Sequence, residues 1–405
     1  MSRLAFWARR PISRSVVNLI IVFTPVLVDT SARPAFLITC WELTSAEGFK
    51  KLDYYLHDDP RLALAWAPWF SHEYITYFSV QAMDKIMALP QVAVKQNPNI
   101  SSECWPIGPK HVDLYKENYR EVRKLDPLWS FSYSQRNGEF GAEPPIDQTI
   151  EPWKVLVIYS TEPDLNPDCD LDLHKNQKIT GGSHGWRHMQ FRLLGRKFGI
   201  APESFRMNMN FANMAFDCGN DYCGWRYLSR SAHYLADLGN PFHVKVLPGW
   251  MLIKNIFSTH KLFKIVSSVH QSYEVYVERR FREGFPSFKE ALLQGAREGQ
   301  ATKSSVAELM DNYMSVAQKR HNEIFYFFLD QFGRELIDVF REMDQDSHMD
   351  AAAQTNMYAA DAAKVIFRDH NLPALNFLDK ITAEILFDVG RMLGALFNSF
   401  SSLRK

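Results

Sequence analysis

The sequence is poor in cysteine and has no excess of charge of either sign. Its five cysteines in 405 residues are too few for a disulfide scaffold, and they lack the paired spacing of a structural cysteine–zinc site. Cys218 and Cys223 are close enough to form a disulfide across a short turn. The 46 basic residues balance 46 acidic ones, so no overall field favours nucleic acid or an anionic membrane. Any such preference must therefore be local.

The apolar run near the amino terminus argues against a membrane-spanning helix, although an uncleaved signal anchor stays an alternative to a cleaved signal segment. It covers residues 16 to 28 and contains Pro25, whereas a spanning helix needs about 20 apolar residues. Arginines precede this run and the small residues Thr30-Ser31-Ala32 follow it, which is the pattern of a cleaved signal segment over residues 1–32. We therefore expect a secreted or otherwise exported protein.

Repeats, long heptad runs and low-complexity tracts are also lacking, so solenoids and coiled coils are excluded. Downstream of residue 66, apolar residues recur three and four apart, and alternation with period two is not sustained. We expect an all-α fold, with a multi-helix domain over residues 66–345 and a C-terminal helical extension, residues 346–405, packed on its core. Residues 33–65 are expected to be a pro-segment or a linker.

The expected helices have approximate bounds. They cover residues 71–89, 184–197, 222–238, 256–281, 288–297, 304–341, 351–367 and 375–400. Residues 153–159, WKVLVIY, are interpreted as a buried strand or a short apolar approach to a loop. Residues 90–148 are interpreted as an irregular insertion with a short helix near residues 114–123.

One segment, SRSAHYLADLGNPFH at residues 229–243, gathers three side chains that can bind a metal. On a helix, His233 and Asp237 project from the same face, and residues 239–241 (Gly-Asn-Pro) end the helix and bring His243 nearby. Between Arg230 and Lys245, Asp237 is the only residue with a formal charge apart from histidine, and its neighbours are mostly apolar. Burying a lone carboxylate costs several kcal/mol unless a cation neutralises it, so a metal is a suitable partner. The alternative is a His and an Asp that bond only to each other.

A second expected helix repeats the arrangement. His270 and Glu274, in the sequence HQSYE, again place an imidazole and a carboxylate one helical turn apart. Di-iron carboxylate bundles use Glu-x-x-His spacing instead, which argues against that class. Two such pairs favour a shared cluster of metal ions.

Weaker candidates lie upstream of these two helices. His72 lies in the first turn of an expected helix, a position where histidine is usually structural. An acidic loop offers Glu162 and Asp164, and a glycine-containing segment offers His184 and His188. Within each of these two pairs, either residue is a candidate ligand.

Taken in chain order, these candidate ligands resemble the metal ligands of the zinc-dependent phospholipase C and single-strand nuclease superfamily. That family is an all-α domain that binds three zinc ions through Trp, His, Asp and His, then His-x-x-x-Asp and a further His, and finally His-x-x-x-Glu or His-x-x-x-Asp. The resemblance covers roughly residues 66 to 280. Its most specific part is His-Tyr-Leu-x-Asp…Asn-x-Pro-x-His, allowing one residue of slack around Asn240. The last acid of the pattern is Glu274, which resembles the phospholipase branch, whereas the nuclease branch has Asp at this position.

The resemblance implies a cofactor of two or three Zn²⁺ ions. One ion would be held by Asp164, His188, His233 and Asp237. The second would be held by His243, His270 and Glu274. The third would be held by His72, a bridging Asp237, and the amine and carbonyl of Trp66. Since the family's Trp ligand is the amino terminus of the mature protein, Trp66 can have this role only if residues 33–65 are removed as a pro-segment. Asp164 and His188 are preferred here to Glu162 and His184.

The resemblance also implies a zinc-dependent phosphodiester hydrolase, most simply a phospholipase C that acts on phospholipid head groups through metal-activated water. Asp164 is predicted to orient or deprotonate that water, and Asp237 is predicted to bind two of the ions. Both are therefore predicted to be catalytic residues. The expected partner is a phospholipid or a membrane surface, with no obligate protein partner.

Two alternatives remain at this stage. A nuclease of the same superfamily would need a basic groove with stacking side chains beside the zinc ions. Part of such a groove is offered by Trp225, Arg226, Arg230 and Lys245. The other alternative is a non-catalytic helical zinc protein.

Overall fold

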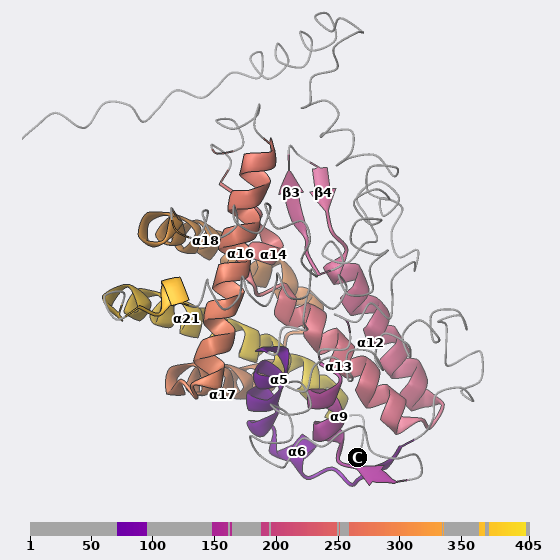
Figure 1. The fold of residues 1–405 in the computed structure, drawn as a ribbon. Coiled ribbons are helices and arrows are strands. Elements are labelled where there is room, and N and C mark those ends of the chain that lie inside the picture. Colours follow the sequence, from indigo (N-terminus) through magenta and orange to yellow (C-terminus); the bar gives the residue numbers. More distant parts are fainter. Residues whose placement is uncertain are drawn as a thin grey trace, which may run out of the picture.

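The computed structural model describes residues 71–94, 148–160, 163, 188–193, 196–248, 251, 259–333, 335, 364–368 and 372–401. Helices dominate these residues (Figure 1), so the mainly helical class expected from the sequence is confirmed. The described strands form two short antiparallel pairs: β1 (Val92–Ala93) with β2 (Thr149–Ile150), and β3 (Phe191–Leu193) with β4 (Arg196–Phe198). The signal segment expected at residues 1–32 lies outside the described residues.

Helix α13 (Asp221–Asp237) lies at the centre of the fold, and α12 (Ala201–Asp217) packs along its outer side (Figure 1). Gly219 in the connection has φ 69°, a left-handed conformation that suits glycine. The side chain of Asn220 then caps α13 by accepting a hydrogen bond from the backbone N–H of Cys223 at 3.2 Å. Every residue of α13 after Asp221 is buried, so side chains on any face of this helix contact other parts of the protein.

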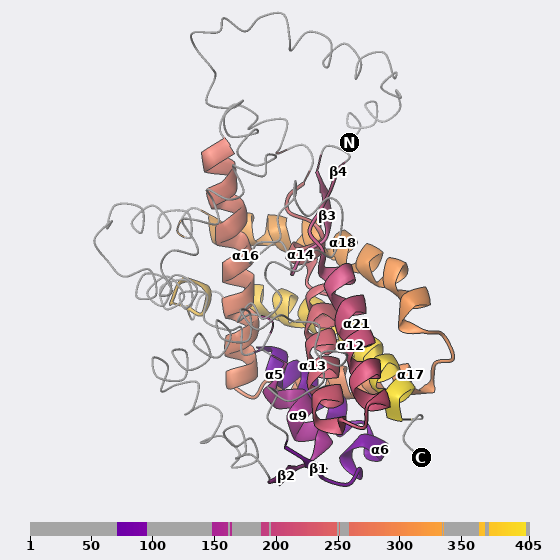
Figure 2. The ribbon, with the colours of Figure 1, turned by 90° about the vertical axis from the view of Figure 1, so that its right-hand side faces the viewer.

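Shorter helices and one long one surround α13. They are α5 (Ser71–Gln81), α6 (Asp84–Met87), α9 (Pro152–Ile158), α14 (Pro241–Val244) and α16 (Thr259–Arg282). Helix α5 contacts α9, α13 and α16, and α16 runs as a separate long column in Figure 2. Helix α14 follows α13 after a short turn, so the end of α13, α14 and α16 can present side chains to one another.

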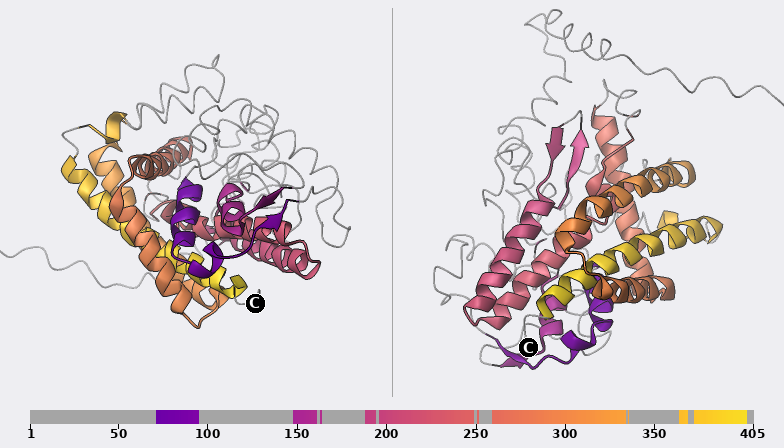
Figure 3. Two further views of the ribbon diagram at one scale, coloured as in Figure 1. Left: turned by 90° about the horizontal axis from the view of Figure 1, so that it is seen from below. Right: turned by 180° about the vertical axis from the view of Figure 1, so that it is seen from behind.

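Three helices late in the chain pack on this centre: α17 (Pro286–Ala301), α18 (Val306–Gln331) and α21 (Leu372–Ser401), seen from behind in Figure 3. Helices α17 and α21 approach closely because glycines face the backbone of the partner helix. A Cβ on Gly299 would lie 1.9 Å from the carbonyl oxygen of Arg391, and one on Gly394 would lie 2.2 Å from that of Ala296. Helix α21 also contacts α13 and α5, which joins the late helices to the centre.

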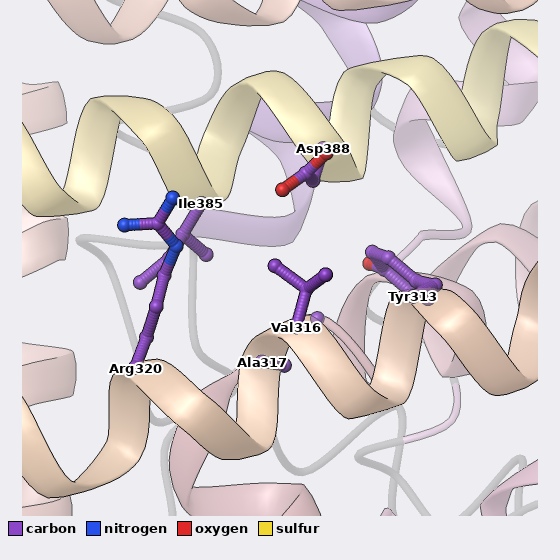
Figure 4. A pocket seen from close by; sticks show the side chains of 7 residues that line it. Tyr313, Val316, Ala317, Arg320, Ile385 and Asp388 are labelled. Atoms are coloured by element: carbon purple, nitrogen blue, oxygen red, sulfur yellow. The ribbon is translucent and has the colours of Figure 1, made fainter.

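A small cavity lies between α18 and α21 (Figure 4), where Arg320 and Asp388 approach Val316 and Ile385. Gly239, directly after α13, also lines this cavity. The turn that follows α13 therefore lies against both α18 and α21.

The helix expected over residues 184–197 is wrong in its described part, because residues 191–193 and 196–198 form the antiparallel pair of strands β3 and β4. Phe191 and Phe198 are directly paired across the two strands, with their rings stacked at a centroid distance of 5.6 Å. Their cross-strand packing stabilises this pair of strands. His188 consequently lies in a turn before β3, and not inside a helix.

Of the two interpretations of residues 153–159, the buried strand is wrong. The segment forms helix α9, which begins at Pro152, a residue suited to the first turn of a helix. Residues 155–158 are all buried. A short apolar run that is buried on all sides carries no periodicity that separates a strand from a helix.

Further differences concern helix bounds and a disulfide. The helix expected over residues 71–89 is divided into α5 and α6, and α12 was not among the expected helices. The disulfide considered between Cys218 and Cys223 is wrong, because Cys223 is a free, buried cysteine. Helices α13, α16, α17 and α21 lie close to their expected bounds, and α18 begins as expected but ends at Gln331. No helix within the described ranges meets the length and apolarity that a membrane span requires.

Candidate metal centre

Asp237, the last residue of α13, lies at the centre of a buried cluster of imidazoles. Its side chain is 1% exposed. Its Oδ2 atom lies 2.8 Å from Nδ1 of His188 and 3.1 Å from Nε2 of His233. Its Oδ1 atom lies 3.1 Å from Nδ1 of His243 and 3.4 Å from Nε2 of His72. Four imidazoles from separate parts of the chain therefore surround one carboxylate.

A second group forms around Glu274 on α16. Its Oε1 atom lies 2.9 Å from Nε2 of His270, one turn earlier in the same helix, and 3.2 Å from Nε2 of His243. The side-chain amide of Asn240 donates a hydrogen bond to the same oxygen at 3.2 Å. The side chains of His270 and Glu274 are 15% and 23% exposed, so this group reaches solvent.

His243 belongs to both groups. Its two ring nitrogens face different acids, Asp237 through Nδ1 and Glu274 through Nε2. Its position follows from the turn after α13, where Asn240 caps the short helix α14 and Pro241 occupies the first helical position. The two clusters are therefore neighbours joined by one imidazole.

A backbone carbonyl fixes the orientation of His233. The Nδ1 atom of His233 lies 2.7 Å from the carbonyl oxygen of Ser160, just beyond the end of α9, and donates a hydrogen bond to it. The proton is thereby held on Nδ1, which leaves the lone pair on Nε2. This Nε2 atom faces Asp237 and lies 2.9 Å from Nδ1 of His188. The carbonyl–imidazole contact is typical of histidines that bind metals.

The charges of the cluster are strongly coupled. Burial alone would raise the pKa of Asp237, but the positive charges of His233, His243 and His188 outweigh this effect and hold its pKa well below the usual value. For His243, burial favours the neutral ring, yet the two acids outweigh burial and raise its pKa to about 10. Glu274, which is partly buried, likewise has a lowered pKa, because the positive charges of His270 and His243 outweigh the effect of burial. The two acids therefore require positive charge nearby, as imidazolium or as a metal cation.

The donor atoms fit a small divalent cation. Nitrogen and oxygen ligands at the corners of a tetrahedron, about 2.0–2.2 Å from a central zinc ion, are about 3.3–3.6 Å apart. The Nε2 atoms of His233 and His72 lie 3.1 and 3.4 Å from oxygens of Asp237. In the second group the corresponding distances to Glu274 are 2.9 and 3.2 Å. Two sets of three residues can each hold a metal ion: His72, His233 and Asp237, and His243, His270 and Glu274.

The structure brings together every predicted ligand that lies within the described residues. These are His72, His188, His233, Asp237, His243, His270 and Glu274. The remaining predicted residues, Trp66 and Asp164, and the alternatives Glu162 and His184 lie outside the described residues. Their roles stay predictions.

Two groups in the centre were not recognised in the sequence. The carbonyl of Ser160 orients His233, and no sequence pattern could identify it, because every residue has a carbonyl. The amide of Asn240 contacts Glu274. The Gly-Asn-Pro sequence indicated a turn and a cap at this position, but not a contact with a side chain 34 residues further along the chain.

Most of the side chains that could have formed a nucleic-acid groove are buried. Trp225 and Arg230 are each 2% exposed, and Arg226 is 7% exposed. The guanidinium of Arg226 lies over the ring of Tyr159, 4.2 Å from its centroid. Trp225, Arg226 and Arg230 therefore contribute to the core around α13, and a buried side chain cannot stack on bases or contact phosphates.

The chain was compared with protein-family models, curated proteins and solved structures, and no family model, curated protein or solved structure matches it.

Proposed function

We propose that this chain is a zinc-dependent phosphodiester hydrolase of the phospholipase C type, with a helical domain similar to that of the zinc-dependent phospholipases C. The observation that carries the proposal is the convergence of two helical His-x-x-x-acid pairs on His243, which contacts both acids. The order and type of these residues match the resemblance found in the sequence, and their proximity is what a shared metal cluster requires.

The ligand types support zinc among the common divalent cations. Five imidazoles and two carboxylates supply the donor atoms, whereas Mg²⁺ and Ca²⁺ prefer sites built from oxygen alone. When bound, neighbouring zinc ions lower the pKa of a water molecule and neutralise charge on phosphoryl oxygens. Phosphodiester hydrolysis requires both effects.

The residues of the chain divide the remaining tasks. Ser160 and Asp237 hold His233 in one orientation inside the protein, where water is excluded. His270 and Glu274 lie on the side of the cluster that reaches solvent, so a substrate phosphate would approach there. Asp164 is proposed to orient or deprotonate the attacking water, as the resemblance implies.

Phospholipid is favoured over nucleic acid as the substrate. Of the four side chains that the sequence offered for a groove, Trp225, Arg226 and Arg230 are buried in the core, and only Lys245 is partly exposed. A nuclease would therefore need a basic groove made from other residues. The proposed export of the protein would also allow it to meet lipid surfaces.

The test is a side-by-side assay of the purified protein on a choline phospholipid and on single-stranded DNA. We expect zinc in the purified protein, release of a phosphorylated head group from the phospholipid, loss of activity with a chelator, and recovery on addition of zinc. Cleavage of DNA alone would establish the nuclease alternative. Zinc-loaded protein that cleaves neither substrate would refute the proposed activity.

A further inference from the structure

Asn240 connects the end of α13 with α14 and α16, the two helices that supply the second metal group. Its backbone N–H donates to the carbonyl oxygen of Asp237 at 2.9 Å, and its own carbonyl oxygen accepts from the N–H of His243 at 3.0 Å. Its side-chain oxygen accepts from the N–H of Phe242 at 3.1 Å, which caps α14. Its amide nitrogen donates to Glu274 of α16 at 3.2 Å. One residue, 5% exposed, therefore links the end of α13, α14 and α16.

The capping role alone does not require asparagine. A cap needs only an oxygen that accepts from the second or third N–H of the helix, and serine, threonine or aspartate supplies one. The amide group is the additional feature of asparagine, and here it points to a carboxylate. The contact with Glu274 is thus separable from the cap.

The amide contact matters most when a cation is bound. The Nε2 atoms of His243 and His270 both face Oε1 of Glu274, and in the absence of a cation each contact is a hydrogen bond only while the nitrogen carries a proton. A metal ion takes the lone pairs of these nitrogens and displaces their protons. The amide of Asn240 keeps its hydrogens in either state, so it can hold the carboxylate in place with or without the cation.

We propose that Asn240 is a positioning residue for the second metal group, and that its amide sets the zinc affinity of His243, His270 and Glu274. This inference rests on the proposed zinc function and deepens it. Hydrogen bonds from neighbouring side chains to metal ligands typically change metal affinity or activity about 10- to 100-fold when removed. The effect should be confined to the ion held by α14 and α16.

The decisive variant is Asn240→Ser, which retains an oxygen for the N–H of Phe242 but loses the amide that reaches Glu274. Asn220→Ser is a matched control, because Asn220 also caps a helix, α13, is 7% exposed, and belongs to neither metal group. Both changes exchange one capping asparagine for serine. They differ in the amide contact with a ligand.

The measurement is zinc binding by titration calorimetry on the full chain, with zinc content measured after dialysis. For Asn240→Ser we expect about 10-fold weaker binding of one ion or more, with the remaining zinc retained, whereas Asn220→Ser binds as the wild type does. Unchanged affinity in a folded Asn240→Ser protein would overturn the inference. Asn240→Thr, which also caps without an amide, serves as the second variant if the serine protein does not fold, and must give the same result.

The outcomes separate this inference from the proposed function. Wild-type protein that binds no zinc would overturn both. Wild-type protein that binds zinc, together with an Asn240→Ser protein that binds it equally well, would overturn the role of Asn240 only. Equal losses in Asn240→Ser and Asn220→Ser would show that capping, and not the amide, controls the site.

Discussion

The two His-x-x-x-acid pairs have the same spacing but different surroundings. His233 and Asp237 of α13 are 0% and 1% exposed, whereas His270 and Glu274 of α16 are 15% and 23% exposed. Oxygens of Asp237 face four imidazoles, while Glu274 faces two imidazoles and the amide of Asn240. Helical spacing therefore brings an acid to an imidazole in both cases, but packing of the rest of the chain decides how far each pair is buried.

The difference suggests a division of roles in the cluster. A fully buried carboxylate needs cations permanently, so the α13 pair is expected to retain its ion most firmly and to contribute most to stability. The α16 pair can exchange water and substrate at its exposed side. The following changes test whether the two pairs differ in this way.

The largest effect is expected from Asp237→Asn. The change removes the charge that faces His72, His188, His233 and His243, while it keeps the size of the side chain. We expect loss of more than one zinc ion per chain and a fall in hydrolysis beyond about 100-fold, since this residue is a proposed ligand and not only a neighbour of one. Removing one partner of a buried pair also costs about 3–5 kcal/mol of unfolding free energy.

Zinc content, hydrolysis and urea unfolding measure these losses. A matched control is Asp311→Asn on α18, whose side chain is exposed and for which no contact with the cluster is found among the described residues. Full zinc content and full activity in Asp237→Asn would contradict the assignment of Asp237 to two ions.

Glu274→Gln is expected to have a more selective effect. The partly exposed α16 pair should lose one zinc ion and most of the activity, while unfolding free energy falls by only about 1 kcal/mol, the typical value of one hydrogen-bonded contact. Glu283→Gln, in the turn directly after the same helix, is the control, because Glu283 pairs with Arg279 at the same spacing but is 40% exposed. A loss of all zinc in Glu274→Gln would show that the two pairs do not act separately.

The zinc-free protein should respond to pH through His243. Its pKa is raised from 6.5 to about 10, so its stabilising interaction is complete below about pH 6.5 and is lost as pH rises towards 10. The pKa values of Asp237 and Glu274 are lowered, so their contribution is present above their unfolded values of 3.8 and 4.5 and is lost as pH falls. These groups therefore favour highest stability between about pH 4.5 and 6.5.

Melting temperatures of wild type and His243→Gln, measured in chelator from pH 5 to pH 10, test this expectation. The difference between the two proteins should be largest near pH 6 and should disappear towards pH 10. With zinc present the trend reverses, because zinc binding releases protons and strengthens as pH rises. A difference that does not vary with pH would exclude the coupling of His243 to the two acids.

The sequence indicated the helical class and the two pairs because both depend on local spacing. Helix α13 has a capping asparagine, 17 helical residues and a glycine directly after its last turn, and residues four apart on it must share a face. Segments without such a period were misread. Residues 153–159 allow a strand or a short apolar approach to a loop, because all four residues at 155–158 are apolar and no period distinguishes a helix. In the β3–β4 pair, each strand covers only three residues, which is too short for a clear alternation.

The complete cluster could not be derived from spacing. His72 and His188 approach Asp237 from positions 165 and 49 residues away in the chain, and only the resemblance to a known ligand order suggested that they belong together. The groups that orient the ligands were even harder to predict from the sequence. Ser160 acts through a carbonyl, and the amide of Asn240 reaches Glu274 only after α14 and α16 have packed.

The smallest effect on zinc binding is expected at Gly239, which separates Asp237 from the turn that presents His243. A Cβ at this position would lie 2.1 Å from the hydroxyl of Tyr313 and 2.5 Å from a methyl group of Val389. In Gly239→Ala, Tyr313 must move, and its hydrogen bond to the carbonyl of Leu235, 3.0 Å long, is weakened.

Such overpacking costs about 1–3 kcal/mol of unfolding free energy. Gly333→Ala is the matched control, because a Cβ there would be in ordinary contact with Leu329 at 3.5 Å. The small cavity beside Gly239, lined by Val316 and Ile385, gives Tyr313 some room to shift (Figure 4), which keeps the expected cost below that of Asp237→Asn. Since the end of α13 moves with this contact, zinc bound by Asp237 should be released faster, while the ion held by α16 is little affected. The measurement follows zinc release from the protein with a zinc-binding dye, in which each pair should give its own phase. If both phases become faster to the same extent, the two pairs share one rigid support and do not differ as their burial implies.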